Sequence, residues 1–356
     1  MTASTDCDEM ENVLNFAKQL CALPSVSGYE EMAFEGLAEI CKGMFDETYT
    51  NPAGSFTGVI RCGKKDAKIL LLDAHLDEIG FIVSRVYDDG FLSVVRAGGV
   101  DPRVLSASEV TIYGKRPIKG VFTSKPPHLQ APGESAKKLE LDDLYIDTGL
   151  SGEELKTLVR IGDCADARSP ITELKNNYIM GKSLDDKICI AQILRAVQLI
   201  DRSKLGVDIY CLFSAGEEIG GKGAVTGAFN IDADYAVALD VCNCFMPKGR
   251  ESLKELRPGR GSVISYSSTT NRRVTTMLMD TARKHGIKFQ PKGEPGHTGT
   301  NAHHIQISHS GIPCTNMSVP LRYMHTPVEV INLEDVKTGA EILARFAEDL
   351  GGKNND

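Results

Sequence analysis

Residues 67–75, AKILLLDAH, form a short, largely apolar run that is far too short to cross a membrane. Such runs are typical of strands that are buried on both faces of a parallel sheet. Similar runs recur at 207–213 (VDIYCLF), 235–241 (YAVALDV) and 313–319 (PCTNMSV), and helix-like segments lie between them. Alternating strands and helices predict an α/β fold with a mainly parallel central sheet and flanking helices.

The pattern of the sequence changes between Ser84 and Asp163, where short β-like runs alternate with turn signals. At 356 residues the chain exceeds the size at which one core usually stops growing. We therefore expect a discontinuous α/β domain, formed by residues 1–83 and 164–350, with a small β-barrel-like domain inserted at 84–163. Residues 351–356 are expected to be a frayed tail.

Composition restricts the class of partner and the cell compartment. A formal net charge of −8 without a long basic run argues against nucleic acid as a partner, and no stretch is apolar enough to span a membrane. The N-terminus lacks the features of a signal peptide, and the ten cysteines form no CxxC pair, so we expect a cytoplasmic protein with reduced thiols. Cys242 and Cys244 are interpreted as plain thiols rather than a metal or redox pair.

Polar side chains follow the predicted buried strands at the points where they end. Functional crevices in open α/β sheets lie at the carboxyl ends of the strands, so these side chains are expected to meet at one edge. The residues are His75 and Asp77 after the first strand, Glu217 and Glu218 after the second, Asp240 after the third and His325 after the fourth, with Asp185 at the start of a predicted helix.

Imidazole and carboxylate groups together are the ligand set of zinc, cobalt or manganese. Two such ions close together need a carboxylate that bridges them. Asp77 is placed to accept the second ring N–H of His75 and to fix its tautomer. Each residue also has a structural explanation, since Asp185 is a possible helix N-cap and His75 a possible core histidine. Their joint placement favours a metal site.

The remaining histidines of the crevice region are less informative. His297, His303, His304 and His309 cluster between residues 297 and 309 and are interpreted as lining residues rather than as ligands.

Six segments, in chain order, resemble the tetrahedral (TET-type) metallo-aminopeptidases, also called glutamyl or deblocking aminopeptidases and sometimes labelled cellulases. The resemblance extends from residue 20 to residue 336 and is most specific in the segments HLDEIG and RYMHTPVE. The segments are AHLDEIGFIV (74–83), AGGVDPRVLSASEVTIYG (97–114), KSLDDK (182–187), GEEIGGKGA (216–224), LDV (239–241) and SVPLRYMHTPVEV (318–330).

The resemblance implies a dinuclear zinc or cobalt exopeptidase that removes N-terminal residues from peptides, with manganese as a further candidate metal. It implies His75 and Asp240 as ligands of one metal and Glu218 and His325 as ligands of the other. Asp185 would bridge the two metals. Glu217 matches the family's general base.

The family also implies a role for the inserted unit and for assembly. The β unit matches the family's dimerisation domain, so a homo-oligomer built from dimers is expected, and family members often form hollow dodecamers.

The chain departs from the family pattern at three places. It has Asn301 where the family usually has aspartate, Lys187 where the family has arginine, and the segment CNCFMPKG after Asp240. None of these changes removes a matched ligand, but they leave the preferred N-terminal residue open.

Two alternatives remain at this level. The same metal core serves amidohydrolases and deacylases, for which the GEE segment fits equally well. A relative that has lost its metals and its activity is the second alternative, and Asn301 keeps it open.

Overall fold

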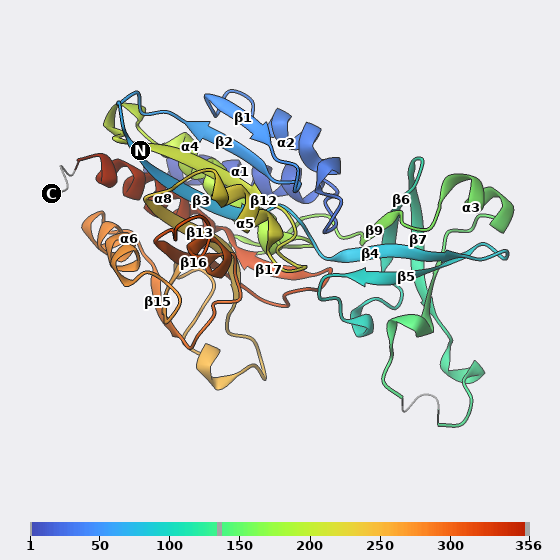
Figure 1. Ribbon diagram of the computed structural model, residues 1–356. Coiled ribbons are helices and arrows are strands. Elements are labelled where there is room, and N and C mark those ends of the chain that lie inside the picture. Colours follow the sequence, from blue (N-terminus) through green and yellow to red (C-terminus); the bar gives the residue numbers. More distant parts are fainter. Residues whose placement is uncertain (1, 134–136, 353–356) are drawn as a thin grey trace.

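A computed structural model of the protein describes residues 2–133 and 137–352. It has two bodies, a large α/β domain and a smaller closed β-barrel that projects from one end of it (Figure 1). The predicted fold class is confirmed. The last helix ends at Gly352, and residues 353–356 of the predicted tail lie outside the described residues.

The α/β domain is built on an eight-stranded sheet. The four central strands run parallel, whereas β2 and β14 pair antiparallel with them at either side. In spatial order the strands are β1 (Glu47–Thr50), β2 (Phe56–Ile60), β12 (Val207–Ser214), β3 (Lys68–His75), β13 (Tyr235–Asn243), β16 (Cys314–Leu321), β14 (Val263–Ser267) and β15 (Gln290–Glu294).

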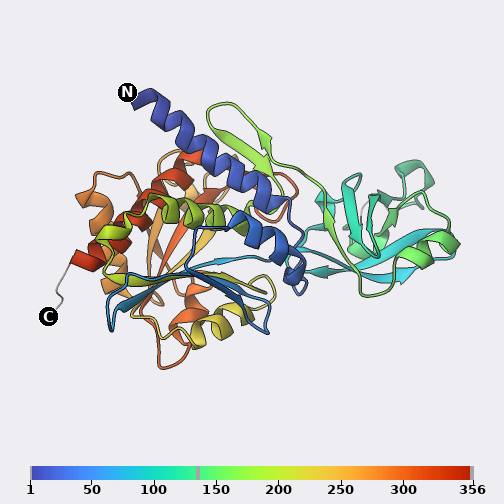
Figure 2. The same ribbon diagram turned by 90° about the horizontal axis from the view of Figure 1, so that it is seen from above.

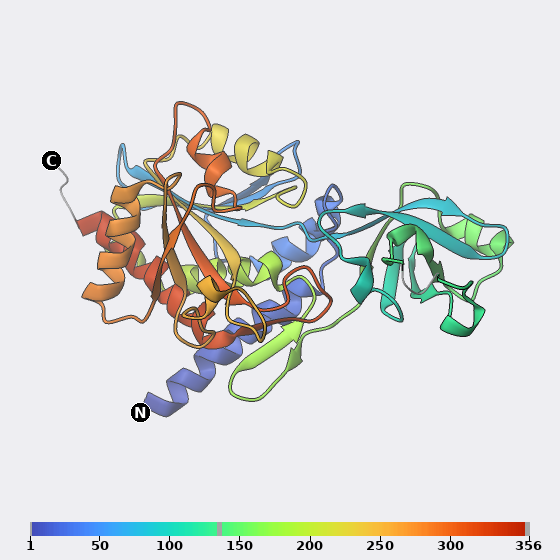
Figure 3. The same ribbon diagram turned by 90° about the horizontal axis from the view of Figure 1, so that it is seen from below.

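Helices cover both faces of this sheet, which explains why its central strands are apolar on both sides. Leu70 and Leu72 of β3 pack into a core with α1, α4 and α8, whereas Leu71 packs on the opposite face with α5 and α7. Figures 2 and 3 show these two layers from opposite sides. The helices are α1 (Thr2–Cys21), α2 (Phe34–Ile40), α4 (Leu184–Leu199), α5 (Lys222–Phe229), α6 (Arg272–Lys284), α7 (Ala302–Gln306) and α8 (Leu333–Gly352).

The register of the parallel strands brings the predicted site residues to one level. Ser214 at the end of β12 pairs with His75 at the end of β3. On the other side of β3, Asp73 pairs with Ala238, so Asp240 lies two residues further along, level with His75. The sheet therefore presents its polar strand ends along one edge.

The inserted unit is a closed barrel with its own core. The barrel strands begin at Gly80 and end at Ala167, compared with the predicted limits of 84 and 163, and α3 (Gly152–Leu158) packs beside them. Its strands in order around the barrel are β4 (Gly80–Val86), β5 (Phe91–Ala97), β8 (Leu144–Asp147), β7 (Pro117–Ser124), β6 (Glu109–Tyr113) and β9 (Cys164–Ala167).

A second, three-stranded sheet joins two distant segments of the chain. It contains β10 (Thr172–Glu173), β11 (Tyr178–Gly181) and β17 (Glu329–Asn332), and Gly181 pairs with Glu329. This pairing places the start of α4 beside the loop that carries His325.

None of the described helices has both the length and the apolar composition needed to cross a lipid bilayer.

Asn301, a departure from the family pattern, holds α7 against the sheet. Its side-chain amide donates hydrogen bonds to Asp73 Oδ2 at 2.9 Å and to Ser214 Oγ at 2.8 Å, and all three residues are buried. Burial raises the pKa of Asp73 to about 6, while these two hydrogen bonds oppose that rise. An amide at position 301 thus supplies the donor that the Asp73 carboxylate needs.

Replacing Asn301 with Asp should destabilise the fold in a pH-dependent way. The change keeps the side-chain size but turns a donor into a second carboxylate facing Asp73. A carboxylate in the unfolded chain has a pKa near 4, whereas the two facing carboxylates of the folded variant retain a shared proton to higher pH. The free energy of unfolding therefore falls as pH rises from about 5 to 8. We expect a loss of about 2 kcal/mol at pH 8 and less at pH 5, measured by urea unfolding.

A double variant provides the control. Asp73→Asn combined with Asn301→Asp restores one amide facing one carboxylate and should recover part of the stability. Equal destabilisation of the single variant at both pH values would contradict the account.

Candidate metal centre

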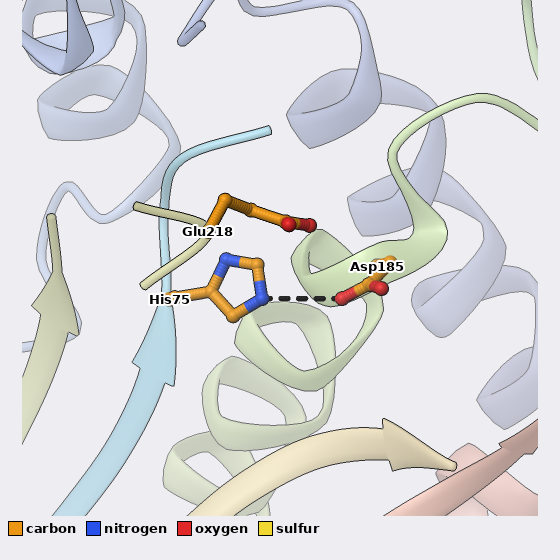
Figure 4. A group of neighbouring side chains, drawn as sticks. All are labelled: His75, Asp185 and Glu218. Atoms are coloured by element: carbon orange, nitrogen blue, oxygen red, sulfur yellow. Dashed lines mark hydrogen bonds and ion pairs between the residues drawn. The ribbon is translucent and has the colours of Figure 1, made fainter. Parts of the chain in front are cut away.

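The side chains of His75, Asp185 and Glu218 meet at the carboxyl edge of the central sheet (Figure 4). His75 ends β3, Asp185 lies in the first turn of α4, and Glu218 lies in the loop after β12. Their ligand atoms all lie within 4.8 Å of one another. Three segments far apart in sequence thus supply the imidazole and carboxylate groups that the sequence predicted to meet.

His75 is oriented through both of its ring nitrogens. Nδ1 lies 2.9 Å from the carbonyl oxygen of Asp77, which can only accept, so Nδ1 carries the proton. In the neutral ring Nε2 then has a lone pair, and it faces Asp185 Oδ1 at 3.1 Å. Two acceptors at this distance require a proton or a cation between them. Burial opposes protonation of His75, but hydrogen bonds to Asp185 and Asp77 raise its pKa well above the usual value.

His325 repeats this arrangement on the other side of Asp185. Its Nδ1 lies 3.0 Å from the carbonyl oxygen of Gly99, and its Nε2 lies 3.3 Å from Asp185 Oδ2 and 3.1 Å from Glu218 Oε1. Hydrogen bonds to Asp185 and Glu218 raise the pKa of His325 to about 11. Each oxygen of the Asp185 carboxylate therefore faces a different imidazole.

The carboxylate of Asp77 supports the loop that carries the two glutamates. Its oxygens accept hydrogen bonds from the backbone N–H groups of Glu217 at 2.9 Å and Glu218 at 3.3 Å, and from the Ser27 hydroxyl at 2.6 Å. The nearest Asp77 carboxylate oxygen is 3.6 Å from His75 Nδ1, further than the Asp77 carbonyl. The predicted orientation of His75 by Asp77 therefore runs mainly through the main chain.

Asp240 lies beside a residue that sequence reasoning did not single out, Asp186. Ligand atoms of Asp240, Asp186 and His75 lie within 4.8 Å of one another, and all three side chains are buried. Asp186 Oδ2 accepts a hydrogen bond from the His75 backbone N–H at 3.2 Å, and its Oδ1 has no hydrogen-bond partner among the described residues. The aspartate doublet in KSLDDK was the available signal.

Glu329 is a second residue that the sequence did not single out. It is buried, and its carboxylate accepts hydrogen bonds from the backbone N–H groups of Asp185 at 3.0 Å and His325 at 2.8 Å. One side chain thus fixes the backbone of two candidate ligands. Its only sequence signal was its position at the end of the segment RYMHTPVE.

Lys187, another departure from the family pattern, is completely buried behind the site. Its ammonium group donates to the carbonyl oxygen of Leu23 at 2.6 Å and to Glu78 Oε1 at 3.0 Å. Glu78 also accepts from Lys182 and Ser183. Burial alone would raise the pKa of Glu78, but the two lysines lower it to about 2, so the carboxylate stays ionised.

The charge of the site favours bound cations. Five carboxylates converge on two imidazoles at this edge, and burial together with neighbouring carboxylates raises the pKa of Asp240 well above its usual value. Buried charge is tolerated when it is paired or coordinates a metal.

The spacing of the donor atoms is also suitable for a metal. Ligand atoms around a tetrahedral ion lie roughly 3.4 Å apart, given metal–ligand distances of about 2.1 Å. The imidazole Nε2 atoms and the carboxylate oxygens of Asp185 and Glu218 are separated by 3.1–3.3 Å. The donor set therefore fits divalent metal ions. The carboxylates are Asp185, Asp186, Glu217, Glu218 and Asp240.

The remaining candidate residues lie outside these ligand groups. The ring of His303 makes edge-to-face contacts with the rings of His297 and His304, and His309 packs edge-on against Phe229. Cys242 and Cys244 are free thiols in a small apolar cluster, as predicted.

Known proteins resemble this chain over most of its length. A family model described as M42 glutamyl aminopeptidase matches residues 54–342. A lysyl aminopeptidase from Pyrococcus furiosus is 31% identical over 339 residues, covering 94% of this chain and 96% of the relative.

Solved structures agree with this match. An aminopeptidase from the archaeon Desulfurococcus kamchatkensis superposes with a TM-score of 0.87 at 32% identity, covering 96% of this chain and 95% of that one. A Pyrococcus horikoshii TET1 peptidase, described as assembling into a tetrahedron or a large octahedral shell, gives a TM-score of 0.82 at 28% identity over 94% of this chain and 99% of that one.

The two adjacent aspartates should differ in their effect on metal binding. Asp185→Asn removes charge from the carboxylate between both imidazoles, so we expect it to lose most of the bound metal, measured by elemental analysis after dialysis. Asp186→Asn changes a carboxylate that already accepts a backbone hydrogen bond. Substitution of supporting groups of this kind typically weakens metal affinity by about 10–100-fold. Asp186→Asn should therefore retain metal at saturating zinc, and equal loss in both variants would contradict the distinction.

Proposed function

The chain belongs to the M42 glutamyl aminopeptidase family, and on that premise we propose that the centre around Asp185 holds two divalent cations and cleaves the first peptide bond of peptide substrates. Membership of the family makes the protein an aminopeptidase, a hydrolase that acts on peptide bonds. The proposal concerns which residues hold the metals and which carry protons.

One observation supports the dinuclear assignment above all others: the two oxygens of Asp185 face two different imidazoles, at 3.1 and 3.3 Å. Asp185 would then help to hold both cations. His75 and Asp240 would hold one of them, and Glu218 and His325 would hold the other. Zinc or cobalt suits this nitrogen and oxygen ligand set, and manganese is also compatible with it.

Bound divalent cations polarise the scissile carbonyl and make a water molecule more acidic. Glu217 is the residue that moves the proton. Its side chain is not needed as a ligand, and the neighbouring Glu218 points towards His325. Glu217 takes a proton from the attacking water as the new C–O bond forms, and it returns that proton to the leaving amine as the C–N bond breaks.

The surroundings of Glu217 suit this exchange. Burial raises its pKa to about 7, and the nearby carboxylates of Asp185 and Glu218 act in the same direction. Asp77 acts as a positioning residue, because it holds the backbone of both Glu217 and Glu218.

The proposal extends to assembly and location. We assign dimerisation to the barrel and expect a homo-oligomer, with a dodecamer as one candidate, since a TET1 peptidase of known structure is described as a dodecamer. A cytoplasmic location is supported by nine cysteines between Cys21 and Cys314, which are free thiols.

Glu217→Gln should separate catalysis from metal binding. The amide keeps the size of the side chain but cannot take up a proton, so turnover should fall by about two or more orders of magnitude while metal content stays at the wild-type level. Glu218→Gln is the matched control one residue away and should lose bound metal as well as activity. Full activity of Glu217→Gln, or unchanged metal content in Glu218→Gln, would overturn the respective assignment.

A substrate panel tests the function itself. Aminoacyl-p-nitroanilides and their N-acetylated counterparts are compared with zinc, cobalt, manganese or a chelator present. Only the free-amine substrates should be cleaved, and the chelator should abolish the activity. Cleavage of blocked substrates alone would indicate an amidohydrolase or deacylase, and no cleavage of any substrate with metal bound would indicate a non-catalytic relative.

A further inference from the structure

A cavity opens directly beside the candidate metal centre, at the junction of the barrel and the α/β domain. Asp185, Glu218 and His325 form one wall of it. Further lining residues come from the start of β4 and from the segment between residues 100 and 105, both of which belong to the barrel side of the chain. A group bound in this cavity therefore lies next to residues that the proposed function assigns to one metal.

The barrel side of the cavity is apolar. Of its lining residues, Phe81 and Leu105 are each 1% exposed, whereas Val104 is 36% exposed. The apolar lining residues include Ile79, Phe81, Val100, Val104, Leu105 and Ala167 of the barrel side, together with Pro327.

The charged residues that line the cavity away from the metal ligands are already paired. Lys182 lies 2.7 Å from Asp166 and also donates to Glu78, which in turn pairs with Lys187. These two lysines and two carboxylates form a largely buried group whose formal charges cancel. Glu329 is occupied by the backbone N–H groups of Asp185 and His325.

We propose that this cavity receives the side chain of the substrate's N-terminal residue and selects an apolar side chain, of the leucine or methionine type. The inference rests on the proposed function. An acidic or basic side chain would enter a site whose fixed charges have partners, so it would lose its hydration without gaining a counter-charge. An apolar side chain loses nothing of this kind and gains contact with the barrel wall.

This preference differs from the activities in the names of two relatives, a lysyl aminopeptidase and a glutamyl aminopeptidase. In this chain the argument rests on Lys182, which lines the cavity and is neutralised by Asp166 and Glu78.

The first experiment compares kcat/KM of the metal-loaded wild-type enzyme for leucyl-, glutamyl- and lysyl-p-nitroanilide. We expect the leucyl substrate to be preferred by about 100-fold over both charged substrates. A preference for the glutamyl or lysyl substrate would overturn the inference but leave the aminopeptidase assignment intact. Absence of cleavage of all free-amine substrates would instead overturn the proposed function.

The second experiment places a charge in the cavity wall. Val104→Lys should raise kcat/KM for the glutamyl substrate relative to the leucyl substrate by about tenfold, because it supplies an unpaired cation. Val104→Glu should do the same for the lysyl substrate. The matched control is Val95→Lys, since Val95 is a 48% exposed valine of the barrel that does not line the cavity.

The direction of these changes separates specificity from general damage. A variant that merely disturbs the fold lowers kcat/KM for all three substrates together, whereas the proposal requires opposite shifts for Lys and Glu at position 104. Unchanged substrate ratios in both variants, or the same shift in Val95→Lys, would overturn the placement of the N-terminal side chain in this cavity.

Discussion

Negative charge buried at the end of a parallel sheet is the constraint on which the rest of this structure depends. Five carboxylates surround two imidazoles, and both imidazoles donate their Nδ1–H to main-chain carbonyl oxygens. Their Nε2 atoms are thereby left facing Asp185, where a positive charge is required. A fold that places so many acceptors together out of water is stable only if cations or protons compensate them, and this requirement favours a metal centre over a cluster of core residues.

The scaffold meets this constraint by fixing the backbone around the site. Asp77 accepts hydrogen bonds from the N–H groups of both adjacent glutamates, and Glu329 accepts from those of Asp185 and His325. These two carboxylates hold elements from four distant parts of the chain in a fixed relation. The two adjacent glutamates consequently have different proposed roles: Glu218 faces His325, and Glu217 is left to exchange protons.

The barrel contributes to this centre in addition to its proposed part in assembly. The carbonyl of Gly99, just after β5, orients His325, and barrel residues form the apolar wall of the adjoining cavity. The position of the barrel therefore bears on the orientation of a candidate ligand and on the space next to it. Figure 1 shows the chain passing from β3 of the α/β domain into β4 of the barrel, and residues 78–81, which follow His75 closely, line this cavity.

Much of this organisation could be read from the sequence, because apolar runs define buried strands and parallel strands present their carboxyl ends at one edge. That rule alone predicts that His75, Glu218, Asp240 and His325 lie at one edge. It did not single out Asp186 or Glu329, nor the pairing of Lys187 with Glu78, because those contacts join segments far apart in the chain through side-chain geometry. The strand pattern by itself determined the fold class and the edge where the chemistry lies. Only tertiary structure decided which carboxylate faces both imidazoles and what lines the cavity, since both depend on how the barrel and the loop after β16 pack against the sheet.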